Sequence, residues 1–136
     1  MKVFVDSSAV VAIIAKEEDV SELRDKLKRY KQRHMSGMVV YESVLALQRL
    51  SGARHDEMLE LVLGFQHSYA FVREPVAINQ RVAELAIKAH EIYGKGRGHP
   101  AKLNMGDCFS YACARMLKAK LLFKGNDFGQ TDIEIA

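Results

Sequence analysis

Near its N-terminus the chain reads KVFVDSSAVVAIIAK, residues 2–16, and this stretch decides the fold. The run KVFV is too short and too rich in Val and Phe for the start of a helix, and it predicts a buried β-strand that ends at Asp6. Residues Ala9–Lys16 then predict a helix, with Ser7 or Ser8 as its N-cap. A strand and a helix are therefore joined directly at an acidic residue.

The rest of the chain continues to alternate strands with helices. Further short strands are predicted at residues 35–38, 69–72 and 120–123, with residues 133–135 as a candidate fifth strand. Apolar residues at helical spacing predict helices between these segments, at 19–33, from about 40 to Gly52, at 58–65, at 78–93 and at 109–117. No repeat or linker interrupts the pattern. We therefore expect a single α/β domain, residues 1–136, with a mainly parallel sheet of four to five strands covered on both faces.

The composition is that of an ordinary folded domain. The chain has 136 residues, 49% of them apolar, and 20 Lys+Arg against 17 Asp+Glu give a formal net charge of +3. Cys108 and Cys113 lie inside one apolar helical stretch, and we interpret both as reduced core residues. No apolar run approaches the roughly 18 residues that a membrane span requires, and no signal peptide is evident. We expect a cytoplasmic protein without a membrane partner.

Acidic residues occupy the positions at which a parallel sheet binds its ligands. Asp6 ends the first strand, and Glu42 lies in the opening turns of the helix after the second strand. Asp107 lies in the first turn of a late helix, and Asp127 follows the fourth strand. Ligands of open parallel sheets bind at the carboxyl ends of the strands. Four carboxylates from four segments are therefore expected to share one crevice.

Such a cluster requires something to offset the repulsion between its charges. Two ionised carboxylates at about 4 Å repel each other by roughly 4 kcal/mol at an effective dielectric constant near 20. Partial protonation or Lys and Arg partners would relieve this repulsion, but a hard divalent cation suits a set of oxygen ligands best, and Mg²⁺ or Mn²⁺ is expected. Such a cation binds a phosphate oxygen and lowers the pKa of a water molecule. The spacing therefore points towards a metal-dependent nuclease.

Each acid also has a structural alternative. Asp6 could cap the helix that follows it, and Asp107 stands three residues after Asn104, the spacing of a reciprocal capping arrangement. Glu42 could be a solvated helix residue, and Asp127 could belong to an Asx-turn. For all four acids we favour the functional interpretation. A carboxylate next to a buried strand, as at Asp6, is costly unless it is paired, and the dipole at the start of a helix stabilises Asp107 without using all of its lone pairs.

Weaker candidates surround these acids. Supporting roles at the metal or its water are open to Ser7, Ser8, Asn104, Asn126 and Asp132, although capping and turn roles are favoured for them. The loop GKGRGHP, residues 94–100, has neither the pattern of a nucleotide-binding loop nor a preceding strand. Within it, Lys95 and Arg97 are candidates for contacts with RNA phosphates, and a solvated connector is the alternative.

Four segments of the chain resemble one protein family. VFVDSSAVVAI, VVYESVLAL, LNMGDCFSYACA and LLFKGNDFGQTDI, taken in this order and spacing, resemble the PIN domain, and more closely the VapC-type toxins of toxin–antitoxin pairs. The resemblance spans nearly the whole chain. It implies a three-layer α/β/α sandwich and an RNA endonuclease that depends on Mg²⁺ or Mn²⁺. It also implies a homodimer that a cognate antitoxin inhibits, with transfer RNA as a frequent class of target.

The resemblance assigns roles to particular residues. Asp6, Glu42, Asp107 and Asp127 match the active-site quartet of the family, with Asp6 and Asp107 as its main metal ligands and Glu42 assisting. The last segment departs from the version of the motif that has Ser or Thr just after the strand, because Lys124 and Gly125 stand there. The participation of Asp127 is therefore less firmly implied than that of the other three acids.

Other functions remain as alternatives. A receiver-type signalling domain phosphorylated on aspartate also gathers acids at strand ends, but it needs paired acids after the first strand, where this chain has Ser7 and Ser8. A phosphatase with an aspartyl nucleophile would require the pattern DxDx[TV], which fails at Ser8. A PIN-like RNA-binding module without catalysis is the third alternative, and a cleavage assay with and without EDTA distinguishes it.

Overall fold

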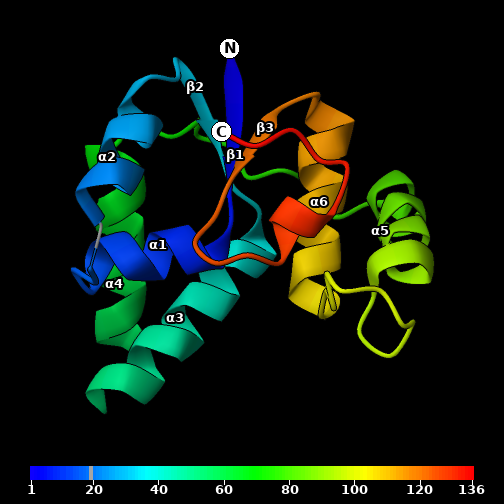
Figure 1. Ribbon diagram of the computed structural model, residues 1–136. Coiled ribbons are helices and arrows are strands. Elements are labelled where there is room, and N and C mark those ends of the chain that lie inside the picture. The colour runs from blue at the N-terminus through cyan, green and yellow to red at the C-terminus, as the bar shows by residue number, and fades with distance from the viewer. Residues whose placement is uncertain (19) are drawn as a thin grey trace.

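The computed structural model describes residues 1–18 and 20–136, in which helices surround a small sheet (Figure 1). The strands are β1 (Lys2–Val5), β2 (Gln32–His34) and β3 (Lys120–Leu122). The helices are α1 (Ser7–Ile14), α2 (Val20–Lys28), α3 (Gly37–Ser51), α4 (His55–Ser68), α5 (Gln80–Tyr93) and α6 (Met105–Leu117). A short 3₁₀ helix, η1 (Phe128–Gln130), follows β3.

The sheet is parallel, in the order β2-β1-β3. Phe4 of the central strand is in register with His34 of β2 and with Leu121 of β3. The side chains of Val3, Phe4 and Val5 are fully buried, as expected for a strand that is covered on both faces. The carboxyl end of β1 therefore lies between the carboxyl ends of its two neighbours, and Asp6 is the first residue beyond it.

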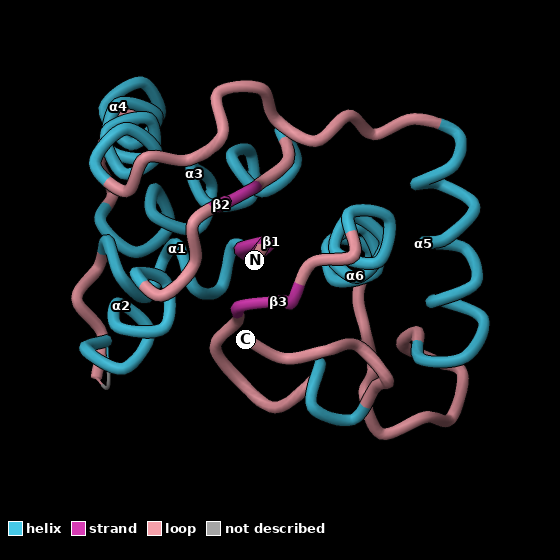
Figure 2. The backbone as a smooth tube through the Cα atoms, turned by 90° about the horizontal axis from the view of Figure 1, so that it is seen from above, coloured by secondary structure: helices cyan, strands magenta, loops and turns pink. Residues whose placement is uncertain are grey.

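Helices cover both faces of the sheet. Viewed from above, α1, α2 and α4 lie on one side of the three strands, and α6 lies on the other side with α5 outside it (Figure 2). Helix α6 packs against β1 and β3 on its inner side and against α5 on its outer side. The predicted α/β/α sandwich with a parallel sheet is confirmed.

The predicted number of strands is too high: among the described residues the sheet has three strands, not four to five. The second strand lies at Gln32–His34 rather than at 35–38, because Ser36 accepts a hydrogen bond from the Val39 N–H and starts α3 at Gly37. The predicted helix at 19–33 accordingly ends at Lys28; its residue 19 lies outside the described residues.

The other two predicted strands are reduced to isolated contacts. The segment 69–72 forms a turn and an irregular stretch after α4, with Ala70 at a φ of 50°, and the bridge nearby joins Val76 to Ser36. At 133–135 a single bridge joins Ile135 to Leu121. Each segment makes too few consecutive backbone pairs to form a strand.

The predicted N-cap of α1 is wrong, whereas the prediction for the two cysteines is confirmed. The N-cap of α1 is Asp6, not Ser7 or Ser8, because a carboxylate directly after the strand reaches the free N–H groups of the first helical turn. Cys108 and Cys113 are free and buried, as predicted. Across residues 1–18 and 20–136, no helix has the length and apolar character needed to cross a membrane.

Candidate active site at the end of the central strand

Both carboxylate oxygens of Asp6 are held by hydroxyl groups. Its side chain is only 3% exposed. Ser8 donates to Oδ2 through its backbone N–H at 3.0 Å and through its hydroxyl at 2.6 Å. The buried hydroxyl of Ser110 donates to Oδ1 at 2.6 Å from helix α6. These bonds satisfy one lone pair or more on each oxygen and fix the direction in which the carboxylate points.

Ser110 was missed by the sequence analysis, although a signal for it exists. It stands three residues after Asp107 on the same helix, and residues at this spacing share one helix face. A residue on the face that carries Asp107 is therefore also directed towards the end of β1. Through Ser110, the structure connects helix α6 to Asp6 across the sheet–helix interface.

Glu42 projects from α3 towards the first turn of α6. A Cβ atom built on Gly106 would overlap the Glu42 carboxylate, so the absence of a side chain at Gly106 is what makes room for it. The Glu42 Oε1 atom is buried and has no hydrogen-bond partner among the described residues. A buried carboxylate oxygen without a donor is costly, and a cation is one group that would satisfy it.

Asp107 occupies the N3 position of α6 and completes a capping box. Its backbone N–H donates to Asn104 Oδ1 at 2.9 Å, and its Oδ2 accepts from the Asn104 N–H at 3.1 Å. The spacing Asn104–Asp107 predicted this reciprocal arrangement. Because one carboxylate oxygen makes the capping bond, the other oxygen remains available to a ligand.

The electrostatic environment of the site disfavours negative charge. Burial, followed by the charges of Asp6 and Asp107, raises the pKa of Glu42 from 4.5 to about 7. Burial also raises the pKa of Asp107 from 3.8 to about 6; the backbone of Asn104 opposes this shift, and the charges of Asp6 and Asp127 add to it. Such mutual repulsion between acids is typical of functional sites.

The acids line one cavity of about 400 Å³. Of the residues predicted from the sequence, the structure brings together in its wall Asp6, Ser7, Ser8, Glu42, Asn104 and Asp107. Glu17 and Lys124 also line it and were not among the predicted site residues. The ion pair that they form, Lys124 Nζ to Glu17 Oε2 at 2.5 Å, joins segments 107 residues apart, which is a contact that no local pattern reveals.

The donor set of this cavity fits a hard divalent cation. Its acids offer oxygen ligands of the kind that Mg²⁺ and Mn²⁺ prefer. The unsatisfied Oε1 of Glu42 and the space left by Gly106 are the observations that support the fit. Within residues 1–18 and 20–136, no three His, Cys, Asp or Glu side chains already converge as a metal cluster.

Two other candidates lie near this cavity but do not line it. Asp127 and Asn126 are exposed in the loop that follows β3. Asp127 lies close enough for its charge to contribute to the raised pKa of Asp107. Its side chain makes no capping bond to η1, so the Asx-turn alternative has no support from the capping geometry.

Asp132 belongs to a different cluster. It accepts hydrogen bonds from the Tyr111 hydroxyl at 2.5 Å and from Arg115 at 2.6 Å, both on α6. These partners hold the C-terminal segment against the helix. This arrangement agrees with the structural alternative for Asp132 and places it outside the acidic cavity.

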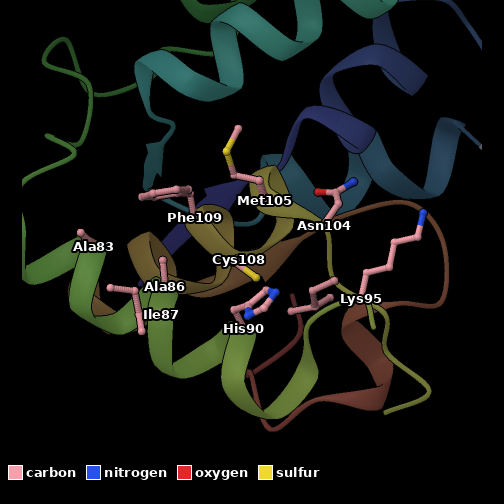
Figure 3. Close-up of a pocket in the computed structure, with 10 residues that line it drawn as sticks. Ala83, Ala86, Ile87, His90, Lys95, Asn104, Met105, Cys108 and Phe109 are labelled. Carbon is pink, nitrogen blue, oxygen red and sulfur yellow. The ribbon is translucent and has the colours of Figure 1, made fainter. Parts of the chain in front are cut away.

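Lys95 and Arg97 lie in the loop between α5 and α6, and each donates a hydrogen bond to a backbone carbonyl. The Lys95 N–H donates to the Leu103 carbonyl at 2.8 Å, and Arg97 Nε donates to the Glu91 carbonyl at 3.4 Å. Lys95 lines a second cavity, of about 530 Å³, between α5 and α6 (Figure 3). The wall of that cavity is mostly apolar, and Asn104 is the residue that it shares with the acidic cavity.

Comparison with known proteins agrees with this fold and site. The family model of the PIN domain matches residues 3–134. Ribonuclease VapC42 of Mycobacterium tuberculosis is 39% identical over 132 residues, covering 97% of each chain. The VapC ribonuclease R02377 of Rhizobium meliloti is 40% identical over 141 residues, covering 96% of this chain and 98% of the relative. The chain belongs to the PIN-domain family, and within that family to the VapC-type proteins.

Proposed function

We propose that this protein is the ribonuclease toxin of a toxin–antitoxin pair and that it hydrolyses RNA phosphodiester bonds with Mg²⁺ or Mn²⁺. The observation that carries the proposal is the acidic cavity, where Asp6, Glu42 and Asp107 meet at the end of the central strand. The names of the relatives, VapC ribonucleases similar over nearly their whole length, support the activity. A cognate antitoxin and a second copy of the chain are the proposed protein partners, and the compartment is the cytoplasm.

In this proposal Asp6, Asp107 and Glu42 hold the cation. Ser8 and Ser110 orient the Asp6 carboxylate through their hydroxyl groups, and the capping box orients Asp107. The cation, when bound, supplies a Lewis acid for the scissile phosphate and lowers the pKa of a water molecule. Asp127, in the loop after β3, is the fourth acid of the proposed site, although it does not line the cavity. Its charge contributes to the raised pKa of Asp107.

The raised pKa values of two of these acids make cation binding dependent on pH. Glu42 and Asp107 hold protons more tightly than isolated carboxyl groups do, because their pKa values are raised. A cation that binds here must displace those protons, so cation binding is expected to strengthen as the pH rises through about 6 to 7. Asn104, which lines both cavities, is a candidate for a contact with substrate or with water at the site.

The test is RNA cleavage by the purified protein and by Asp107→Asn. We expect the parent protein to cut single-stranded RNA in Mg²⁺, EDTA to abolish the cutting, and added Mg²⁺ or Mn²⁺ to restore it. The isosteric variant keeps the capping acceptor but loses a charged ligand, and cleavage should fall by about 100-fold or more. Sequencing of the RNA ends then reports the class of target, with transfer RNA as one candidate.

Three results would contradict the proposal. Cleavage that persists unchanged in EDTA would exclude a required cation. An Asp107→Asn variant as fast as the parent would exclude this assignment of the site. RNA binding without any cleavage, in either cation, would favour a non-catalytic RNA-binding module instead.

A further inference from the structure

Lys124 is anchored at the rim of the acidic cavity by the residue that also holds Asp6. Its backbone N–H donates to Ser8 Oγ at 3.0 Å, and the same hydroxyl donates to Asp6 Oδ2 at 2.6 Å. The bond from Lys124 to Ser8 joins the loop that follows β3 to the first turn of α1; Figure 1 shows the course of that loop from β3 to η1. The backbone of Lys124 is therefore fixed relative to the proposed ligand Asp6.

The charge of Lys124 opposes that of the remaining wall. Among the described residues that line the cavity, Lys124 is the only Lys, Arg or His, and the charged groups that accompany it are Asp6, Glu17, Glu42 and Asp107. An RNA phosphate that enters the cavity meets mainly like charge, and a single divalent cation does not balance four carboxylates. A cationic group beside the entering phosphate would offset part of this repulsion.

The ion pair with Glu17 keeps the Lys124 ammonium at the cavity without binding it strongly. The two side chains are 41% and 35% exposed, and solvent-exposed pairs of this kind contribute at most about 1 kcal/mol. A phosphate oxygen is an acceptor of comparable or greater strength for an ammonium group. Exchanging the Glu17 carboxylate for a phosphate therefore costs little.

We infer that Lys124 binds a backbone phosphate of the RNA at the rim of the acidic cavity and that Glu17 positions its ammonium group in the substrate-free protein. This inference rests on the proposed ribonuclease function, and it adds a substrate-binding residue and a positioning residue to it. The sequence motif had shown only that Lys124 stands where Ser or Thr was expected.

The first experiment measures cleavage of a short single-stranded RNA by Lys124→Met. The phosphate contact exists both before and during the reaction, so KM should rise about tenfold while kcat stays within about threefold. Lys88→Met is the matched control, because Lys88 is exposed on α5 and does not line the cavity. Its KM and kcat should equal those of the parent.

The second experiment measures RNA affinity against salt in the Asp107→Asn background, where the RNA stays intact. Loss of one phosphate contact should lower the slope of log affinity against log salt by about 0.7 for a single strand. Lys124→Met should show this decrease, Lys124→Arg should keep the slope of the parent, and Lys88→Met should leave it unchanged. A folding check by circular dichroism accompanies each variant, and Lys124→Gln, which also removes the charge and should show the same decrease in slope, takes the place of Lys124→Met if that variant does not fold.

The role of Glu17 is tested by a double-mutant cycle. Glu17→Gln frees the ammonium group of Lys124, and RNA affinity should rise about threefold when Lys124 is present but not in the Lys124→Met background. An equal rise in both backgrounds would mean that Glu17 only repels RNA, and it would overturn the positioning role.

The outcomes separate this inference from the function on which it rests. If the parent cleaves RNA and Lys124→Met has the KM, kcat and salt slope of the parent, Lys124 does not bind phosphate, and only this inference fails. If the parent cleaves no RNA in Mg²⁺ or Mn²⁺, the proposed function fails first. A fall in kcat alone, with KM unchanged, would also overturn the assignment to ground-state phosphate binding.

Discussion

Helix α6 contacts two carboxylates whose surroundings are opposite. Asp132 receives hydrogen bonds from Tyr111 and Arg115, and these partners, Tyr111 foremost, lower the pKa of Asp132. Asp107, at the start of the same helix, is half-buried among other acids, and burial is the main reason that its pKa is raised to about 6. The comparison distinguishes a carboxylate whose charge the protein stabilises from one whose charge burial and the neighbouring acids disfavour.

The largest expected effect of this difference is on activity. Glu42→Gln removes one carboxylate from the acidic cavity, and kcat/KM for RNA cleavage should fall by about 10- to 100-fold because a group that we propose as a ligand of the cation is lost. Asp132→Asn is the matched control, and its kcat/KM should stay within twofold of the parent. Equal losses in the two variants would mean that the two carboxylates do not differ in function.

Gly106→Ala sharpens the comparison without changing any charge. The added Cβ would overlap the Glu42 carboxylate, which must move away, and cleavage should fall by about tenfold as that group is displaced. The displaced group is the flexible end of a side chain, so the melting temperature should not fall. In the control Gly64→Ala, on α4, nothing lies within 4 Å of the new Cβ. That variant should keep full activity and gain about 0.5–1 kcal/mol of stability.

The Asp132 cluster is expected to affect stability instead. Arg115→Met removes the guanidinium group that forms an ion pair with Asp132 and so helps to hold the C-terminal segment against α6. Both side chains are partly exposed, so the free energy of unfolding should fall by only about 1 kcal/mol, which corresponds to about 4 °C in melting temperature. Thermal unfolding at low salt measures the change, and kcat/KM should not change. A loss of cleavage with an unchanged melting temperature would reverse the two roles.

A further expected effect is the dependence of stability on pH without added metal. The pKa of Glu42 is raised from 4.5 to about 7, so between these values the folded state binds more protons than the unfolded state. The free energy of unfolding should therefore decrease as the pH rises from about 5 to 7. Mg²⁺ should reverse this trend, since it binds better to the ionised site.

Thermal unfolding at several pH values, with and without Mg²⁺, checks this prediction. Glu42→Gln serves as the control, because an amide in place of the carboxyl group should flatten the pH dependence and remove part of the stabilisation by Mg²⁺. A parent protein whose stability without metal increases from pH 5 to 7 would contradict the repulsion described for the cavity.

The sequence predicted what local patterns determine. The strand at 2–5, the helix that ends at Gly52 and the capping box of Asn104 and Asp107 all depend on neighbouring residues, and the structure confirms them. The α/β/α layering followed from the alternation of these elements. The predicted strands at 69–72 and 133–135 were wrong, because an apolar β-rich run becomes a strand only if a partner strand is adjacent in space.

The sequence also predicted those residues of the cavity that stand at the ends of strands and the starts of helices, but not the contacts between distant segments. Asp6, Glu42 and Asp107 stand where strands end or helices begin, so the topology brings them together. Ser110 could have been predicted, because it lies three residues after Asp107 and therefore on the same face of α6. The pairing of Glu17 with Lys124 was not, because it depends on the path of a loop that no periodicity describes. The partners of Asp132 were also hidden, since Tyr111 and Arg115 meet it only after the C-terminal segment folds back.

The central position of β1 has a consequence for synthesis on the ribosome. Asp6 emerges early, but the hydroxyl of Ser110 and the carboxylate of Asp107 come from residues made about a hundred positions later, and β3 joins the sheet later still. A chain interrupted by premature termination before residue 107 lacks Asp107, Lys124 and Gly125, which line the cavity. The acidic cavity is therefore assembled only in a nearly finished polypeptide.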